Sequence, residues 1–375
     1  MPREDDRLHI SGAPAAVAPG EAPFFSLIMP AYGVERYIMD SVADILCQTY
    51  CNFELIIVDD ASPDRSAAIA EEVAGGDPRV SILHHEHNRG VSEARNTGIR
   101  AARGTWLMFP DPDDRYDTDM LELVANALAE SECDLLVFAH TQEYFDAGGS
   151  YLYSNPMPIR DMRIDGKAEI GRIALELEKE THLGYPWNKA YRRSIIESFG
   201  LSFETVPYIE DILFNLDYLK HVEALAALSA NPYRYAKRLA ANLTNAADAR
   251  YFDVHRRRIQ EVRNMLVSRA CFDEDAMAVL GSLYARYIMS ALERNCSPAA
   301  GLTARERSDW LTALYDDSLF CEIIPHAQSD ESRALSTCIW LLQTHNTPAL
   351  LAAGRAIHIV RERSTTLYTK ARSKR

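Results

Sequence analysis

The chain has 375 residues, a hydrophobic fraction of 47% and a net charge of −14. This length favours a main domain with a smaller second one, and the acidity excludes the broad basic surface that general nucleic-acid binding requires. The seven cysteines are scattered singly without a CxxC pair, which is typical of a reducing compartment. No apolar run approaches the length of a membrane span, and the acidic N-terminus is unlike a signal peptide, so we expect a cytoplasmic protein.

Short apolar runs alternate with amphipathic segments from residue 24 onwards. Residues 1–23, rich in Ala, Pro and charge, are expected to form a disordered leader. Buried strands are expected at 24–29, 55–58, 80–83, 105–109 and 135–139, and helices at 37–46, 91–102 and 120–128. Strands that alternate with helices predict an α/β fold with a doubly wound, mostly parallel sheet over residues 24–240.

The pattern is less regular after the fifth expected strand. Residues 146–158 are expected to form a loop, followed by a helix at 168–177. Beyond residue 240, helices are expected at 252–268, 275–294, 304–315 and 331–343. These segments predict a helical C-terminal domain over residues 241–354.

Residues 355–375 form a basic tail with seven Lys or Arg residues and one acid, Glu362. Such a tail favours peripheral contact with anionic lipid, which for a cytoplasmic protein means the inner face of the membrane. A solvated, disordered end explains the same composition, and both interpretations stay open.

Two acidic clusters follow expected strands. Asp59-Asp60 follows the second strand, and the run Asp-Pro-Asp-Asp at 111–114 follows the fourth. The carboxyl ends of parallel strands meet at one edge, where open α/β sheets bind their ligands. Crowded carboxylates need a partner, and a divalent metal that carries a diphosphate would be a suitable one. An acidic surface turn is the alternative, because Asp and Pro are ordinary turn residues.

Taken in order, these and further motifs resemble the family 2 glycosyltransferases, which have the GT-A fold and use nucleotide-activated sugars. The matching segments are SLIMPAY at 26–32, ELIIVDDASPD at 54–64, NRGVSEARNTG at 88–98, DPDD at 111–114, PWNK at 186–189 and Glu210-Asp211. They cover about residues 24–220, and the helical domain gains no function from them. The pattern is similar to that of bacterial enzymes that build surface polysaccharides.

The resemblance implies a hexosyltransferase-like enzyme. It would transfer a sugar from a nucleotide-sugar, expected to be a UDP-sugar, to a hydroxyl of a glycan or lipid-linked acceptor. The reaction would depend on Mg²⁺ or Mn²⁺, invert the anomeric centre and serve cell-surface polysaccharide synthesis. The motifs do not specify the donor sugar, the acceptor or the linkage.

The resemblance assigns nucleotide contacts to Pro30, Tyr32, Asp60, Arg95 and Asp111. Tyr32 offers a π face to the base. Asp60 would accept a hydrogen bond from the base, and its neighbour Asp59 would serve a structural bond instead. Arg95 would lie near the nucleotide, or hold Asp60 or Asp111 in place as a cation.

The metal would be held by Asp111 and Asp113. In the resembling enzymes these acids bind a cation on the donor diphosphate, and hard cations prefer carboxylate oxygens. Asp114 would cap the following turn. Pro110 and Pro112 depart from the family pattern, and they stiffen the loop and remove two N–H donors.

On the acceptor side, the resemblance makes Asp211 the general base and Glu210 a supporting or acceptor-contacting residue. Acids at a helix N-terminus are also favoured by the helix dipole alone. Trp187 would stack on a sugar face, or be an ordinary core residue.

Two other classes of function stay open. A phosphatase of the Asp-x-Asp type, or a nucleotidyltransferase, would use Asp111 and Asp113, but such a phosphatase carries its motif on the first strand. A non-catalytic binding protein on a degenerate transferase domain is disfavoured by the intact acids Asp60 and Asp211. The His-rich run at 84–87 lacks helical i,i+4 spacing and is not expected to bind a metal.

Overall fold

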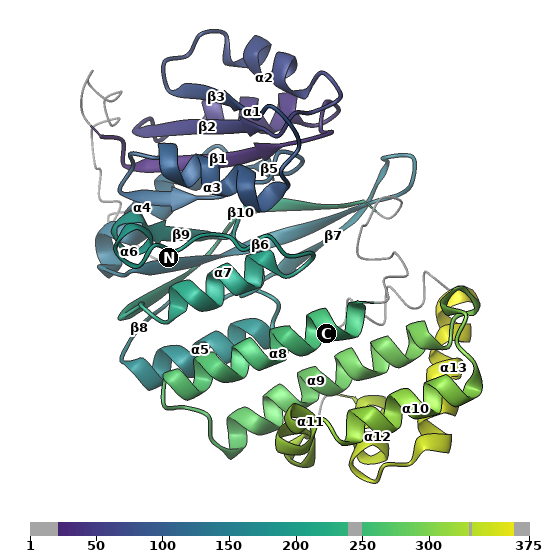
Figure 1. Cartoon of the computed structure of the whole chain (residues 1–375). Helices are drawn as coiled ribbons and strands as arrows, with labels where there is room; N and C mark the ends of the chain where they lie inside the picture. Colours follow the sequence, from purple (N-terminus) through teal and green to yellow (C-terminus); the bar gives the residue numbers. More distant parts are fainter. Residues whose placement is uncertain (1–21, 239–249, 330–331, 364–375) are drawn as a thin grey trace, which may run out of the picture.

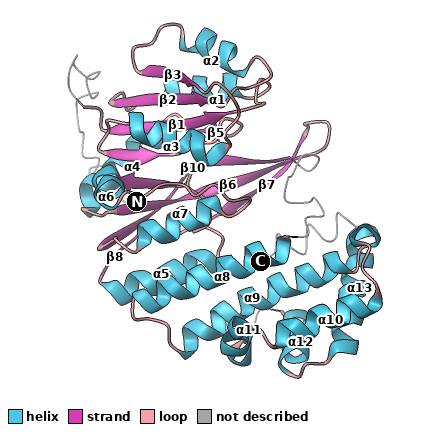
Figure 2. Cartoon of the chain, in the orientation of Figure 1, coloured by secondary structure: helices cyan, strands magenta, loops and turns pink. Residues whose placement is uncertain are grey.

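The computed structural model describes residues 22–238, 250–329 and 332–363. A mixed α/β part is followed by a helical part (Figure 1). The arrangement of strands and helices confirms the predicted α/β class (Figure 2). The leader expected at 1–23 lies outside the described residues except for its last two, and the basic tail lies outside them beyond residue 363.

The N-terminal half of the sheet is parallel. Its strands are β1 (Phe25–Ala31), β2 (Phe53–Asp59), β3 (Val80–His84) and β4 (Trp106–Met108). The helices that connect them are α1 (Ile38–Leu46), α2 (Ser66–Ala74) and α3 (Val91–Ala101). Strand β1 pairs with β2 on one side and with β4 on the other. The acids that follow β2 and β4 therefore lie at the same edge of the sheet.

The C-terminal half of the sheet is mixed. Its strands are β5 (Arg115–Tyr116), β6 (Leu135–Phe145), β7 (Tyr151–Met157), β8 (Met162–Asp165), β9 (Lys189–Arg192) and β10 (Ala224–Arg238). The strand order is β3-β2-β1-β4-β9-β6-β10-β5, with β7 beside β6 and β8 beside β10. The loop expected at 146–158 is wrong, because most of it forms β7 and pairs antiparallel with β6.

Helices cover both faces of the sheet. The remaining helices of this part are α4 (Met120–Ser131), α5 (Lys167–Lys179), α6 (Arg193–Phe199) and α7 (Glu210–Leu219). Along β1, Leu27 and Met29 belong to the buried cluster that includes α1 and α4, whereas Ile28 belongs to the one that includes α3 and α7. Alternate side chains thus enter opposite cores, which explains the continuous apolar run in the sequence.

The helical part packs against the face of the sheet that carries α7. Its helices are α8 (Tyr251–Ser268), α9 (Glu274–Asn295), α10 (Ala304–Tyr315), α11 (Ser318–Ile323), α12 (Arg333–Gln343) and α13 (Thr347–Arg363). Val262 of α8 and Ile212 of α7 lie in one continuous buried cluster. An ion pair of 2.7 Å between Arg258 and the buried Glu178 joins α8 to α5.

Among the described residues, no helix is both long and apolar enough to cross a membrane.

Candidate active site

Three residues far apart in the sequence meet at the edge of the sheet where the acids after β2 and β4 lie. We call this the acidic edge. Arg95 of α3 is 4% exposed at its side chain, and its Nη1 lies 2.5 Å from Oδ1 of Asp211, in the first turn of α7. Its Nη2 lies 3.2 Å from Oδ1 of Asp111, in the loop after β4. One guanidinium therefore bridges the acid predicted to act on the donor and the acid predicted to be the base.

The Arg95 side chain packs on the ring of Phe203. The guanidinium carbon lies 5.2 Å from the centre of the Phe203 ring, within the range of a cation–π contact. Asn96, the next residue of α3, donates to the Phe203 carbonyl at 2.8 Å and accepts from its N–H at 2.8 Å. Helix α3 thus fixes both the cation and its aromatic support.

The carboxylates of this edge outnumber the cations. The pKa of Asp111 is raised to about 7, mainly by burial and also by the Asp113 charge, against the opposing effect of Arg95. Burial and the Asp211 charge raise the pKa of Glu210 to about 6. The pKa of Asp211 is also raised by burial, against the effect of Arg95. The site therefore favours binding of a further positive charge.

Asp113 forms a separate ion pair with the end of β10. Nη1 of Arg238 lies 2.6 Å from Asp113 Oδ2, and Nη2 donates to the Asp113 carbonyl at 2.6 Å. The Arg238 guanidinium also lies 3.8 Å from the centre of the Tyr37 ring. The sequence motifs gave no sign of Arg238, because it lies outside all of them.

Asp114 ties the acidic loop to β10. It is fully buried, and it accepts hydrogen bonds from the Tyr233 hydroxyl at 2.7 Å and from the Ala236 N–H at 2.8 Å. The Tyr233 hydroxyl accepts in turn from the Asp111 N–H at 3.2 Å. Ser41 of α1 donates to the carbonyls of Pro112 and Asp114, at 2.8 and 2.6 Å. Asp114 therefore has a structural role, in bonds across the sheet rather than a cap on the next turn.

Asp60 is buried in a network of hydrogen bonds. Its Oδ1 accepts from the Arg89 N–H at 2.8 Å and lies 2.6 Å from His85 Nδ1, and its Oδ2 accepts from the Gly90 N–H at 2.7 Å. His85 Nε2 lies 2.9 Å from the Thr97 hydroxyl. Asp60 thus shapes the 85–90 loop, and the expectation that Arg95 would hold Asp60 is not met. The role of His85 could not be predicted from the sequence, because the His-rich run at 84–87 suggests only a metal site and its contact with Asp60 depends on the fold.

Pro30 and Tyr32 lie at the end of β1. Pro30 is buried within the strand, and Tyr32, just after it, is 51% exposed. The Tyr32 ring is thus accessible for the predicted contact with a nucleobase.

The burial of Trp187 is that of an ordinary core residue. Its side chain is 2% exposed, and its ring stacks on Tyr233 at 4.4 Å and on Tyr185 at 4.6 Å. A ring covered in this way has no face for a sugar, so the acceptor-binding role predicted for Trp187 is wrong. Its apolar area is better explained by burial beneath the acidic loop.

The rest of the PWNK motif shapes the loop before β9. Lys189 is fully buried, and its ammonium donates to the carbonyls of His182 and Tyr185, at 2.7 and 2.5 Å, and to Asn188 Oδ1 at 2.7 Å. Three acceptors satisfy the three donors of the ammonium. At the entrance to α7, by contrast, the buried Glu210 Oε2 has no hydrogen-bond partner among the described residues.

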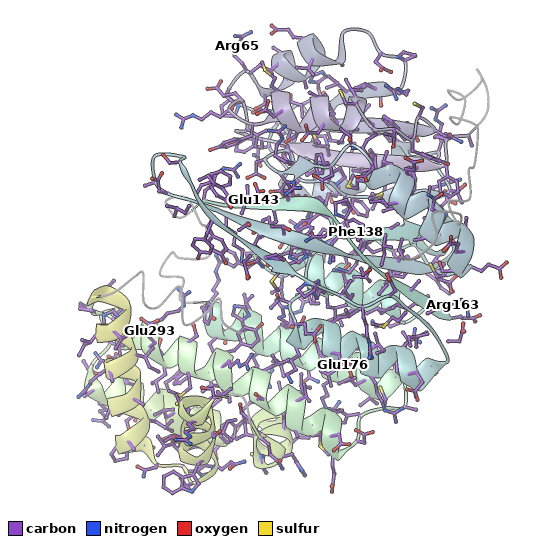
Figure 3. The ribbon with its side chains drawn as sticks, turned by 180° about the vertical axis from the view of Figure 1, so that it is seen from behind. Arg65, Phe138, Glu143, Arg163, Glu176 and Glu293 are labelled. Atoms are coloured by element: carbon purple, nitrogen blue, oxygen red, sulfur yellow. The ribbon has the colours of Figure 1, made fainter. Side chains whose placement is uncertain are left out.

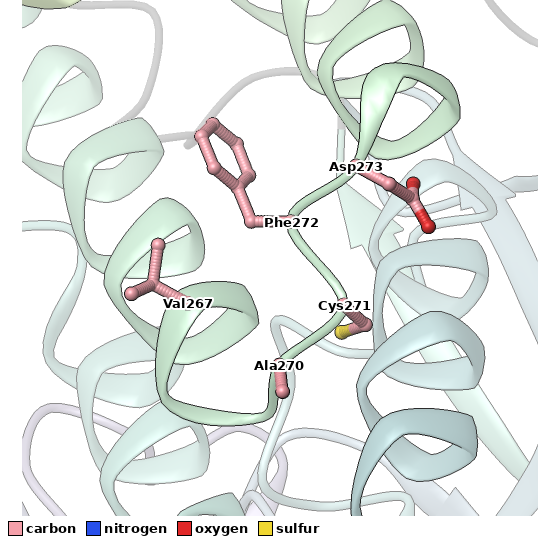
Figure 4. Close-up of a pocket in the computed structure, with 5 residues that line it drawn as sticks. All are labelled: Val267, Ala270, Cys271, Phe272 and Asp273. Atoms are coloured by element: carbon pink, nitrogen blue, oxygen red, sulfur yellow. The ribbon is translucent and has the colours of Figure 1, made fainter.

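Two pockets in the described residues lie away from the acidic edge. One, of about 350 Å³, is formed at the turn between α8 and α9 by Val267, Ala270, Cys271, Phe272 and Asp273 (Figure 4). A larger one, of about 680 Å³, lies between the segment around β8 and α5. Neither includes a residue of the acidic edge, so the candidate site is defined by its charged side chains.

Related sequences support the resemblance of this part of the chain to the glycosyltransferases. Residues 26–200 match the family described as Glycosyl transferase family 2. The chain is 33% identical over 214 residues to the uncharacterized glycosyltransferase EpsJ of Bacillus subtilis (strain 168), a match that covers 57% of this chain and 61% of EpsJ. It is 38% identical over 160 residues to the minor teichoic acid biosynthesis protein GgaB of the same organism, over 42% of this chain and 17% of GgaB. The chain thus spans less than two thirds of the length of these relatives.

The fold is also shared with a solved structure. TarS 1–349 of S. aureus in complex with UDP matches with a TM-score of 0.60 at 19% identity, over 90% of this chain and 91% of that chain. The complex of the same protein with UDP-GlcNAc matches with a TM-score of 0.58 at 21% identity, over the same shares. Taken with the motifs and the acidic edge, these matches show that the chain carries a glycosyltransferase family 2 domain over residues 26–200.

Proposed function

We propose that the protein transfers a sugar from a nucleotide-sugar donor to a hydroxyl of a glycan or lipid-linked acceptor, in the synthesis of a bacterial surface polysaccharide or teichoic acid. The observation that carries this proposal is the Arg95 bridge, which brings Asp111 and Asp211 to one edge of the sheet. A donor acid and an acceptor base must act on the same anomeric carbon, and the bridge holds them within reach of one substrate.

A uridine nucleotide is the proposed carrier of the sugar. TarS, which shares the fold, has been solved with UDP and with UDP-GlcNAc. In this chain the exposed Tyr32 would stack on the base, and Pro30 and Asp60 would shape the base pocket. The buried hydrogen bonds of Asp60 suit it to order this pocket as well as to bind.

The residues present fit Mg²⁺ or Mn²⁺. Asp111 and Asp113 offer hard carboxylate oxygens. The pKa of Asp111 is raised mainly by burial and also by the charges of Asp113 and Asp211, and a bound cation would oppose both effects. No group of three His, Cys, Asp or Glu side chains in the described residues is arranged to hold a metal ion. Donor oxygens and water would therefore complete the coordination. Such an ion would neutralise charge on the departing nucleoside diphosphate.

Asp211 is the proposed general base. It would accept the proton of the acceptor hydroxyl while that oxygen attacks the anomeric carbon from the side opposite the diphosphate, which inverts the centre. The bond to Arg95 orients its carboxylate. Glu210 lies beside Asp211 in the first turn of α7, and it would support the base or contact the acceptor.

We place the reaction at the inner face of the cytoplasmic membrane, where a lipid-linked acceptor would be presented. The basic residues of 355–375 support peripheral contact with anionic lipid.

The test is the metal-dependent release of nucleoside diphosphate from a panel of nucleotide-sugars with Mn²⁺. We expect one donor to be hydrolysed slowly, and D111N and D113N to lower the rate by about a hundredfold. The control is D217N, which changes a half-exposed acid of α7 that pairs with Lys220. Equal rates in D111N and D217N would show that Asp111 takes no part in the reaction and would refute the proposed metal site. Phosphate release from simple esters with no donor hydrolysis would replace this proposal by a phosphatase.

A further inference from the structure

Helix α13 is anchored to α9 along one face. Leu350 is buried, and Gly354 lies so close to α9 that a Cβ there would be 2.8 Å from Leu292 Cγ. One turn further on, His358 Nδ1 lies 2.9 Å from Oε1 of Glu293, which is labelled in Figure 3. The four-residue spacing of these contacts places them on one side of the helix and so leaves the opposite side facing outward.

The outward face of α13 is apolar. Over residues 347–360 its exposed positions are Pro348, Ala352, Arg355, Ala356, Ile359 and Val360. Ile359 is 49% and Val360 is 53% exposed. Single exposed apolar residues are normal, but a solvated helix face is expected to be polar.

Among the described residues, a second pair of consecutive large apolar residues is exposed, and its charged surroundings differ from those of the α13 patch. That second pair, Tyr151-Leu152 at the start of β7, adjoins a loop that contains Asp146. The α13 patch instead includes Arg355 and is followed by six more Lys or Arg residues and one Glu, in a chain of net charge −14. A face with apolar residues and an adjoining cluster of basic ones fits the interface of an anionic bilayer.

A second copy of the chain is a poorer fit. A symmetric contact through this face would bring Arg355 of both copies into one apolar interface, and the like charges would oppose it. The lipid surface supplies both the apolar layer and the negative charge.

We propose that the outward face of α13, made by Ala352, Arg355, Ala356, Ile359 and Val360, is the docking surface for an anionic membrane. This inference deepens the membrane contact of the proposed function, because it assigns that contact to a folded helix as well as to the tail. In Figures 1 and 3, α13 lies on the same side of the molecule as the tip of the β6–β7 hairpin. Strand β10, whose Arg238 pairs with Asp113, is parallel to β6 and ends toward that side. Docking through α13 would thus turn the acidic edge toward a lipid-linked acceptor.

The experiment is co-sedimentation of the full chain with vesicles of phosphatidylcholine, alone or mixed with phosphatidylglycerol, at low and high salt. We expect binding to the anionic vesicles, and about a tenfold weaker partition for I359Q/V360Q at both salt concentrations. K370Q/R372Q/K374Q/R375Q should weaken binding mainly at low salt. The control is V267Q on α8, where Val267 has the same 49% exposure as Ile359, and it should bind as the wild type.

Three outcomes would overturn the proposal. They are no binding of the wild type to anionic vesicles, unchanged binding of I359Q/V360Q, or a self-association of the wild type that I359Q/V360Q abolishes. Glutamine keeps the helix propensity of an exposed position, and thermal melting checks that the variant is folded. Donor hydrolysis without vesicles is measured in parallel. If it persists in I359Q/V360Q, a failure to dock is distinct from a failure of the glycosyltransferase itself.

Discussion

Arg95 and Asp211 are joined by a contact of 2.5 Å between Nη1 and Oδ1, although they lie 116 positions apart in the sequence. The contact links helix α3, which follows β3, to helix α7, which precedes β10. The same guanidinium also contacts Asp111, in the loop after β4. A movement of this loop would therefore shift Arg95 and, through it, the proposed base Asp211. Arg95 therefore couples the two halves of the site.

Removal of the Arg95 charge should destabilise the protein. R95M leaves Asp111 and Asp211 without a counter-charge, and the loss of one partner from such a buried network costs on the order of 3 kcal/mol. Urea unfolding at pH 7.5 measures this loss. The control is R100M, which changes an exposed arginine of the same helix. At pH 5 the difference should shrink, because protonated carboxyls no longer need the cation, and equal stability of the two variants at pH 7.5 would contradict the bridge.

The raised pKa of Asp111 predicts a pH dependence of stability in the metal-free protein. In the unfolded chain this carboxyl titrates near its usual value of about 3.9, whereas in the folded protein its pKa is raised to about 7. Between these values the folded state binds the extra proton, so the free energy of unfolding falls as the pH rises from about 4 to 7 and levels off above. D111N should flatten this slope in urea titrations from pH 4 to 8. An identical slope in D111N would refute the assignment, while Glu210, whose pKa is also raised, should retain part of it.

The sequence was sufficient for the elements whose pattern is local. Strands β1 and β2 are buried on both faces and read as apolar runs, and the acids after β2 and β4 meet where parallel strands require. Strand β7 was missed because Asn155 and Pro156 are poor strand formers. It exists through its pairing with β6, a contact that no local pattern encodes.

The partners of the site residues were harder to predict than the residues. Arg95 and Asp111 were singled out, but the contact of Arg95 with Asp211 depends on how α3 and α7 pack. Arg238 reaches Asp113 across 125 positions of sequence, and nothing near it signals that pairing. The sequence also left two roles open for Trp187, because an aromatic residue within a motif can either contact a ligand or be buried in the core. The catalytic roles themselves remain predictions.

Arg238 should compete with a metal ion for Asp113. Its ion pair with Oδ2 must open before that oxygen can act as a ligand, and a partly exposed pair of this kind is worth about 1 kcal/mol. We therefore expect R238Q to bind Mn²⁺ about fivefold more tightly in the absence of nucleotide, as measured from the free Mn²⁺ signal in electron paramagnetic resonance. R234Q is the control, because Arg234 lies on the same strand but pairs with Asp117. Weaker Mn²⁺ binding in R238Q would show that Arg238 organises Asp113 rather than competes for it.

The buried Lys189 should contribute far more to the stability of the protein than an exposed lysine such as Lys220 does. K189M keeps most of the side-chain volume but removes all three donors, so the carbonyls of His182 and Tyr185 lose a buried partner. Each lost bond to a charged donor costs about 1.5–3 kcal/mol, and relaxation of the loop offsets part of the sum, so we expect a loss on the order of 3 kcal/mol in urea unfolding. The control K220M breaks an exposed pair with Asp217 and should change the stability by less than about 0.5 kcal/mol. If K189M proved as stable as K220M, the PWNK lysine would have to be explained by contact with a substrate, and its loss would then appear in donor hydrolysis instead.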